Sequence, residues 1–171
     1  MASFVTSNSK SLSGSIRVPG DKSISHRSII LGSIATGTTR VSGFLQGEDS
    51  LATLNAFKDM GVLIKRDGSD VTIQGVGMHG LNAPTKPLNL GNSGTSIRLM
   101  SGLLSAQSFD SELCGDESLS KRPMGRVIEP LRQMGADISG PDSMPPLSIN
   151  GGKNLSAIEY TLPVASAQIK S

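Results

Sequence analysis

The stretch that decides the fold is VPGDKSISHR, which runs from Val18 to Arg27. It recurs as LGNSGTSIR from Leu90 to Arg98 and as LPVASAQIK from Leu162 to Lys170. The spacing is roughly 70 residues, longer than the period of about 20–50 residues typical of solenoids, so each copy is predicted to be a small folding unit. Two complete copies and the beginning of a third are present. We therefore expect the chain to be a truncated portion of a longer protein.

Hydrophobic periodicity predicts the same order of elements, β-α-β-α-β-β, in each copy, which is an α/β (α+β) fold. Unit 1 spans residues 20–87, unit 2 spans 88–156, and residues 157–171 begin unit 3. In the first copy we predict strands over 14–19, 38–44, 62–65 and 70–74, with helices over 23–36 and from an N-cap at 49–50 to residue 60. In the second copy we predict strands over 87–90, 109–114, 136–139 and 147–149, with helices over 95–106 and 124–134. A strand over 157–162 and a helix from 166 open the third copy.

The composition limits the possible classes of function. The 171 residues carry a formal net charge of +2, with 3% aromatic residues and no Trp. The basic groove and stacking aromatics of a single-strand nucleic-acid binder are therefore missing. The single Cys114 excludes an internal disulfide framework and is interpreted as a small buried residue. No apolar run approaches the ~18 residues of a membrane span, and the Ser-rich start resembles no signal peptide, so we expect a cytoplasmic protein.

The chemistry is expected at the first helix of each copy, because each begins with small polar residues and carries a cation four positions on. The three pairs are Ser23 with Arg27, Gly94 with Arg98, and Ser166 with Lys170. A helix N-terminus attracts anions, whereas a cation in its first turn is unfavourable by about 0.3–1 kcal/mol unless an anion compensates. Three such pairs indicate helix starts that converge on an acidic ligand. The alternative is three ordinary capped helices whose basic side chains reach solvent.

The remaining motifs and charged residues say less about function. A P-loop requires Gly-x-x-x-x-Gly-Lys-Ser/Thr, but in GDKS an aspartate separates the glycine from the lysine. Arg122, in the KRPM motif before a predicted helix, is either solvated or directed at the same anion pocket. His26 and His79 have no companions at metal-ligand spacing, so both are interpreted as structural and no metal is expected. Four acids are interpreted as helix-start residues: Glu48, Asp49, Asp116 and Glu117.

Four motifs, GDKSISHR, LGNSGTSIR, KRPM and SAQIK, follow one another over the whole chain from about Leu12. Together they resemble the 5-enolpyruvylshikimate-3-phosphate synthase family, which glyphosate inhibits, and the GDKS and SAQ-x-K forms resemble its bacterial class II. UDP-N-acetylglucosamine enolpyruvyl transferase shares the architecture of the wider family but not this motif set. The alternatives are a related enolpyruvyl transferase or a stand-alone phosphate- or anion-binding module of the same lineage.

The resemblance implies an inside-out barrel of two halves, each built from three β-α-β-α-β-β units. In the family the first strand, here residues 1–19, crosses toward the other half, and the carboxy-terminal half is the partner that this chain lacks. The implied reaction transfers the enolpyruvyl group of phosphoenolpyruvate to the 5-hydroxyl of shikimate 3-phosphate and releases phosphate, without a cofactor. The acid/base carboxylates of the family lie outside this chain. No catalytic residue is therefore assignable, and the isolated piece is expected to be inactive.

The resemblance also assigns binding roles residue by residue. The residues that match shikimate 3-phosphate contacts are Lys22, Ser23, Arg27, Ser166 and Gln168. The residues that match phosphoenolpyruvate contacts are Lys22, Gly94, Arg122 and Gln168. Glyphosate is expected against Gly94 as well. Ala167 departs from the serine of the other class, so only its backbone could contact a phosphate.

Overall fold

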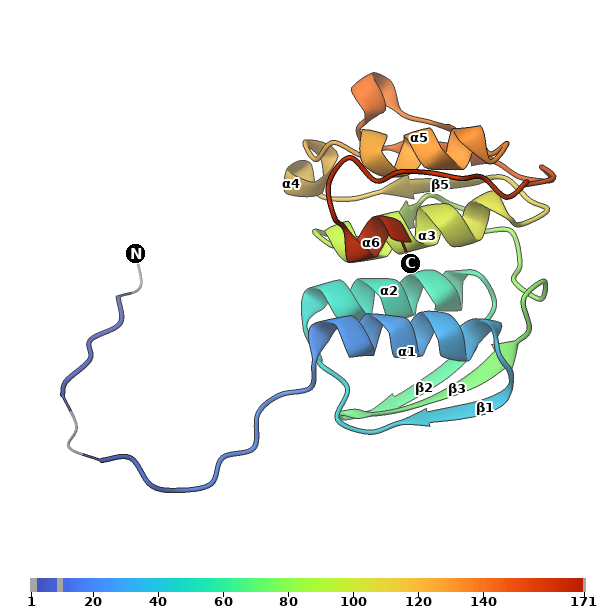
Figure 1. Cartoon of the computed structure of the whole chain (residues 1–171). Coiled ribbons are helices and arrows are strands. Elements are labelled where there is room, and N and C mark those ends of the chain that lie inside the picture. The colour runs from blue at the N-terminus through green and yellow to red at the C-terminus, as the bar shows by residue number, and fades with distance from the viewer. Residues whose placement is uncertain (1–2, 9–10, 171) are drawn as a thin grey trace.

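The first repeat folds as two helices, α1 (Lys22–Ile34) and α2 (Glu48–Asp59), that cover a small sheet (Figure 1). The computed structural model describes residues 3–8 and 11–170. The sheet is antiparallel, with the order β1-β3-β2, and consists of β1 (Thr36–Val41), β2 (Leu63–Asp67) and β3 (Asp70–Val76). Asp67 pairs with Asp70 at the predicted hairpin, where Gly68 has a φ of +54°. Such a backbone conformation favours glycine in a tight turn.

The second repeat has the same order of elements and a complete sheet. It comprises β4 (Leu88–Asn89), α3 (Gly94–Ser105), β5 (Ser111–Cys114), α4 (Glu117–Ser120), α5 (Gly125–Gln133), β6 (Asp137–Ser139), the 3-10 turn η1 (Pro141–Ser143) and β7 (Leu147–Asn150). The sheet order is β4-β5-β7-β6, with β4 parallel to β5 and the other pairs antiparallel. The short helix α4 was not predicted. The other predicted elements of unit 2 are confirmed, and α6 (Ala167–Lys170) follows them.

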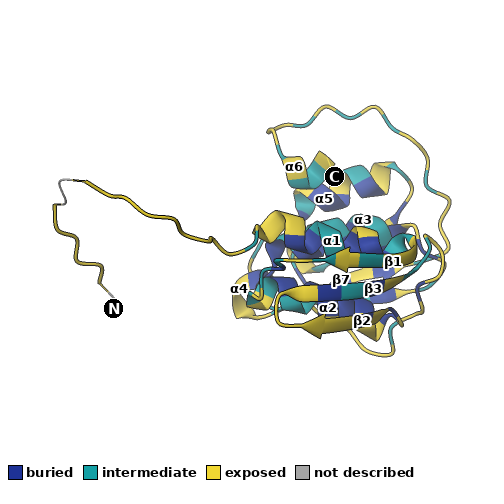
Figure 2. Ribbon diagram, turned by 90° about the horizontal axis from the view of Figure 1, so that it is seen from below, coloured by how far each residue is buried: buried dark blue, intermediate teal, exposed yellow. Residues whose placement is uncertain are grey.

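Two predicted strands are wrong: residues 14–19 and 157–162 form no strand. Ile16 and Val18, the apolar positions of the first pattern, are 88% and 70% exposed, and Figure 2 shows the N-terminal segment leading away from the two units. Alternation of apolar residues favours a strand, but a strand forms only where a neighbouring strand pairs with its N–H and C=O groups. The crossing of residues 1–19 toward another half stays a prediction.

Several predicted helix boundaries also shift. Helix α2 has Gly47 as its N-cap, so the predicted cap at 49–50 is wrong and Asp49 lies in the first turn, where an acid favours the helix dipole. Helix α1 ends at Ile34, before Gly37, which lies in β1 instead. Gly61, with a φ of +89°, directly follows the C-cap of α2 as predicted.

The two units share one hydrophobic core. Its buried residues come from both repeats, as Ile29 and Phe57 of unit 1 and Leu88 and Ile97 of unit 2 illustrate. Helix α1 contacts α3, and α3 contacts α6. In Figure 1, α1, α3 and α6 all begin toward the left side of the two packed units. The shared core therefore sets three helix starts, and the polar residues they carry, on one side of the fold.

Candidate functional site

Helix α3 begins at a glycine that lies against two arginines. Ser93 is the N-cap, and its Oγ accepts the N–H of Ser96 at 3.2 Å. A Cβ atom on Gly94 would stand 2.8 Å from Nη1 of both Arg98 and Arg122. The missing side chain of Gly94 thus lets two guanidinium groups approach the first turn of α3 closely.

Arg98 is held at the centre of this group. Its Nη1 donates to the Gly94 carbonyl at 2.8 Å and to Oε1 of Gln168 at 3.2 Å. Burial lowers the pKa of the Arg98 guanidinium, and the nearby cations Arg122 and Arg126 lower it further. Arg98 and Arg122 therefore lie at a helix start, where the helix dipole already favours negative charge, and Arg126 adds a third positive charge nearby. A bound anion would relieve this repulsion and receive charge-assisted hydrogen bonds.

Helix α6 completes the group from the far end of the chain. Nε2 of Gln168 donates to Oγ1 of Thr95 at 2.9 Å, while its Oε1 accepts from Arg98. A pocket of about 470 Å³ opens here, and its polar lining consists of Arg98, Arg126, Ser166 and Gln168. Because two guanidinium groups, those of Arg98 and Arg126, line it, the pocket has the chemistry of an anion site.

Arg122 reaches Gly94 from the short segment between α4 and α5, which begins at Gly125. Its Nη2 donates to Oδ1 of Asn92, whose Nδ2 donates to Oδ2 of Asp116 at 3.1 Å. The Leu119 backbone N–H lowers the pKa of the Asp116 carboxyl most, and Asn92 and Arg122 contribute less. Arg122 is thus positioned by a neutral amide, which orients the guanidinium without cancelling its charge.

Lys22, Ser23 and Arg27 form a second polar group on α1. Asp21 is the N-cap of this helix and accepts the N–H of Ile24 at 2.8 Å. Lys22 forms an ion pair with Asp49 in the first turn of α2. Ser23 is exposed and Arg27 is half-buried. Lys22 is therefore oriented by a carboxylate from the second helix of its own unit.

The structure brings Gly94, Arg122, Ser166 and Gln168 together in one arginine-rich group. Arg126, which lines the pocket with Arg98, Ser166 and Gln168, was not predicted. The signal was present, since Arg126 follows Arg122 by four positions and lies in the first turn of α5. The amide of Asn92 was missed as well, because a side-chain contact across 30 residues has no periodic signature. Lys170, the predicted cation of the third helix start, is exposed.

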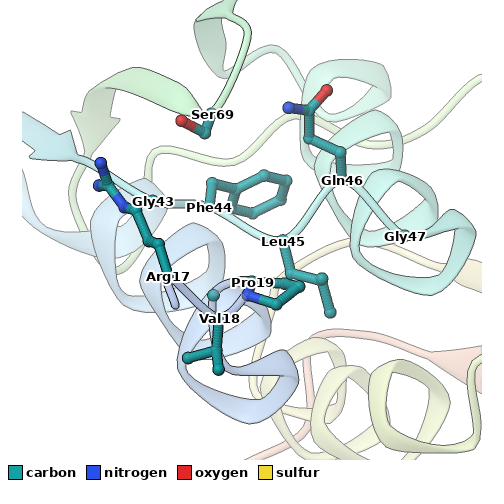
Figure 3. A pocket seen from close by; sticks show the side chains of 10 residues that line it. Arg17, Val18, Pro19, Gly43, Phe44, Leu45, Gln46, Gly47 and Ser69 are labelled. Atoms are coloured by element: carbon teal, nitrogen blue, oxygen red, sulfur yellow. The ribbon is translucent and has the colours of Figure 1, made fainter. Parts of the chain in front are cut away.

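A larger pocket of about 600 Å³ lies elsewhere, between the N-terminal segment and the loop that leads into α2 (Figure 3). Arg17, Phe44 and Gln46 are among its lining residues. Its lining is mainly backbone and apolar side chains around a single arginine. The clustered cations, rather than the larger volume, identify the pocket beside α3 as the candidate site.

Residues 6–171 match the profile of a protein family, EPSP synthase (3-phosphoshikimate 1-carboxyvinyltransferase). The chain belongs to this family. It is 65% identical over 171 residues to the 3-phosphoshikimate 1-carboxyvinyltransferase of Ruthia magnifica subsp. Calyptogena magnifica, covering 100% of this chain and 39% of that protein. To the enzyme of the same name from Nitrosococcus oceani it is 59% identical over 170 residues, covering 98% of this chain and 38% of that protein.

The fold of the family is also found in the structure. EPSP synthase from Acinetobacter baumannii superposes with a TM-score of 0.88 at 62% identity, covering 92% of this chain and 36% of that chain. The resemblance drawn from the four motifs is therefore confirmed, as is the α/β fold. The chain spans less than two fifths of the length of the curated relatives described here.

Two further findings concern the described residues only. Among them, no helix combines the length and apolar character needed to cross a bilayer. In the same part of the chain, no group of three or more His, Cys, Asp or Glu side chains is placed to hold a metal ion.

Proposed function

We propose that this chain forms part of the active site of a 3-phosphoshikimate 1-carboxyvinyltransferase and binds the phosphate end of phosphoenolpyruvate beside Gly94. In the reaction, the bond between the enolpyruvyl carbon and the phosphate oxygen breaks and a bond to the 5-oxygen of shikimate 3-phosphate forms. The proton of the 5-hydroxyl is lost and phosphate leaves. The observation that carries the proposal is the approach of Arg98 and Arg122 to Gly94 at the start of α3, with Arg126 lining the adjoining pocket.

The chemistry of phosphoenolpyruvate suits this group. The molecule carries a phosphate and a carboxylate, and each can accept two parallel hydrogen bonds from one guanidinium. Arg98 and Arg122 both lie against Gly94. Two guanidinium groups are therefore close enough together to bind the phosphate and the carboxylate of one phosphoenolpyruvate molecule. Gln168 joins the same group through Arg98 and Thr95.

Shikimate 3-phosphate is assigned to the neighbouring residues. We propose that Lys22, Ser23 and Arg27 bind it from α1, and that Ser166 and Gln168 bind it from the start of α6. The segment that makes up the remaining length of the relatives is proposed to supply the opposite wall of the site and the groups that move protons. A cytoplasmic location and a reaction without a cofactor stay part of this proposal.

Calorimetric titration of the chain with phosphoenolpyruvate tests the assignment of Arg122. A charged hydrogen bond contributes about 1.5–3 kcal/mol, so Arg122→Ala is expected to weaken binding roughly 10- to 150-fold. Lys121→Ala is the matched control, because it removes the adjacent cation, which pairs with Glu117 on the exposed surface. Equal weakening by the two substitutions would show that general charge, and not the Arg122 contact, attracts the ligand.

A second experiment separates the enzyme from an anion-binding module. The chain is mixed with the carboxy-terminal part of the Ruthia magnifica relative, and phosphate release is followed with both substrates present. Activity that requires shikimate 3-phosphate and falls with Arg122→Ala supports the transferase. Binding of phosphoenolpyruvate with no phosphate release in the mixture favours the stand-alone module instead.

A further inference from the structure

His26 lies where the two units meet, one turn after Lys22 on α1. Its side chain is fully buried, and its Nδ1 lies 2.8 Å from Oγ1 of Thr53 on α2 and 3.3 Å from Oγ of Ser96 on α3. A single imidazole nitrogen therefore contacts hydroxyl groups from both units. The sequence predicted a structural role for this histidine but no particular contact.

The hydroxyl groups continue as a chain to the start of α3. Thr53 Oγ1 lies 2.5 Å from Ser96 Oγ, and Ser96 Oγ lies 2.6 Å from Ser93 Oγ. Ser93 is the N-cap that sets the first turn of α3, next to Gly94. At the other end, the Thr53 hydroxyl lies 3.3 Å from the carbonyl of Asp49, the residue that pairs with Lys22. The network thus runs from the Lys22 end of the site to the Gly94 end.

The surroundings of the imidazole favour its neutral form. Burial lowers the pKa of His26 most, Lys22 and Arg27 lower it as well, and Asp49 opposes them. Within the described part of the chain, Nε2 has no hydrogen-bond partner. A second N–H on a charged ring would be left buried and unpaired there, which is costly. The neutral ring instead forms a hydrogen bond with the chain of hydroxyl groups through Nδ1.

We propose that His26 is a positioning residue, which fixes the start of α3 with Gly94 relative to the start of α1 with Lys22. This inference rests on the proposed function, because phosphoenolpyruvate is assigned contacts at both starts. A ligand that spans two helices binds well only when the distance and angle between them are set in advance. Hydrophobic contacts are not directional, so they would allow α1 and α3 to slide along each other. Hydrogen bonds are directional, so the chain of hydroxyl groups favours one relative position of the two helices.

The first test compares two buried serines on one helix. Ser96→Ala removes the middle of the network, and Ser101→Ala removes a hydroxyl that donates only to the Ile97 carbonyl of its own helix, at 2.7 Å. Both serines are no more than 1% exposed, so each of the two variants loses one buried hydroxyl group. We expect Ser96→Ala to weaken phosphoenolpyruvate binding by about fivefold, and Ser101→Ala to leave it unchanged within about twofold.

The second test is rescue at the histidine itself. His26→Asn places an amide oxygen or nitrogen at the position of Nδ1 and keeps the contact to Thr53 and Ser96, whereas His26→Leu fills the space without it. Phosphoenolpyruvate binding should stay close to the original value in His26→Asn and weaken by about fivefold or more in His26→Leu. Equal affinities of these two variants, or equal losses in Ser96→Ala and Ser101→Ala, would overturn the positioning role.

A third measurement is independent of the ligand. Residual dipolar couplings of backbone N–H groups report the angle between α1 and α3 in the unliganded chain. We expect this angle to change in His26→Leu and to be retained in His26→Asn. If the chain does not bind phosphoenolpyruvate at all, the proposed function fails, and this angle still decides the inference. An unchanged angle in His26→Leu refutes it.

Discussion

Replacement of Gly94 by alanine tests the central feature of the site, the approach of two arginines to the start of α3. The added Cβ would stand 2.8 Å from Nη1 of Arg98 and from Nη1 of Arg122. Side-chain Cβ atoms do not occur that close to other heavy atoms, so both guanidinium groups must move. Each is the far end of a flexible side chain, and we therefore expect the fold to persist while the geometry of the site is lost.

The substitution is expected to affect binding much more than folding. Alanine is favoured over glycine in a helix interior by about 1 kcal/mol, and the gain is smaller at the first helical position, so stability should change little. Loss of one charged hydrogen bond from a displaced guanidinium costs about 1.5–3 kcal/mol of binding free energy. We therefore expect phosphoenolpyruvate to bind roughly 10- to 150-fold more weakly. Glyphosate is longer than phosphoenolpyruvate, and the inhibitor is expected to lose more than the substrate.

Gly102→Ala is the matched control, because the same substitution on the same helix meets nothing within 4 Å. Urea unfolding of both variants measures stability, and calorimetric titration measures affinity for phosphoenolpyruvate and glyphosate. We expect Gly102→Ala to be stabilised by about 0.5–1 kcal/mol with unchanged affinities. Unchanged affinity in Gly94→Ala would refute the reasoning, since it would mean that neither arginine needs its place over Gly94 to bind the ligand.

Three further predictions follow from other contacts. The chain should bind shikimate 3-phosphate weakly, with a calorimetric signal that fades as salt is added and is lost in the Lys22→Ala, Arg27→Ala double variant; equal heats from the original and the double variant would contradict this assignment. Because burial lowers the pKa of His26 below its usual 6.5, the unfolded chain binds a proton that the folded chain does not. The free energy of unfolding should therefore fall as the pH drops below about 6.5, by no more than about 1.4 kcal/mol per pH unit, and urea titrations of His26→Asn should show a shallower dependence. Asp21→Ala removes the side-chain cap of α1 and should lower the free energy of unfolding by about 1 kcal/mol, whereas Asp21→Asn, which keeps an acceptor oxygen, should retain most of it.

The elements that the sequence predicted well are those whose signals are local. Helices α1 and α3 start within one residue of the predicted positions, because a small polar cap and an apolar periodicity lie within a dozen neighbouring residues. The repeat itself predicted the order of strands and helices in unit 2. The predicted strands over 14–19 and 157–162 failed because their alternation is a property of the segment, whereas strand formation depends on a partner segment.

For the candidate site, too, some features could be predicted from the sequence and others could not. The helix-start pattern pointed to Gly94, and the resemblance to the family assigned Gly94, Arg122 and Gln168 to phosphoenolpyruvate. Their mutual arrangement could not be predicted, because Arg122 and Asn92 are 30 residues apart, and Arg98 and Gln168 are 70 residues apart. No periodicity in the chain encodes which side chain of one unit will face which side chain of the next.

The sequence by itself predicted a set of anion-binding residues, indicated where most helices begin, and indicated the family to which the chain belongs. Tertiary structure alone decided that Arg98 and Arg122 lie against one helix start and that His26 connects both units through Thr53 and Ser96. The physical reason is how far apart in the sequence the interacting residues lie. Capping and periodicity act between neighbours in the chain, whereas burial, charge crowding and hydrogen-bond networks exist only after the shared core has packed distant segments together.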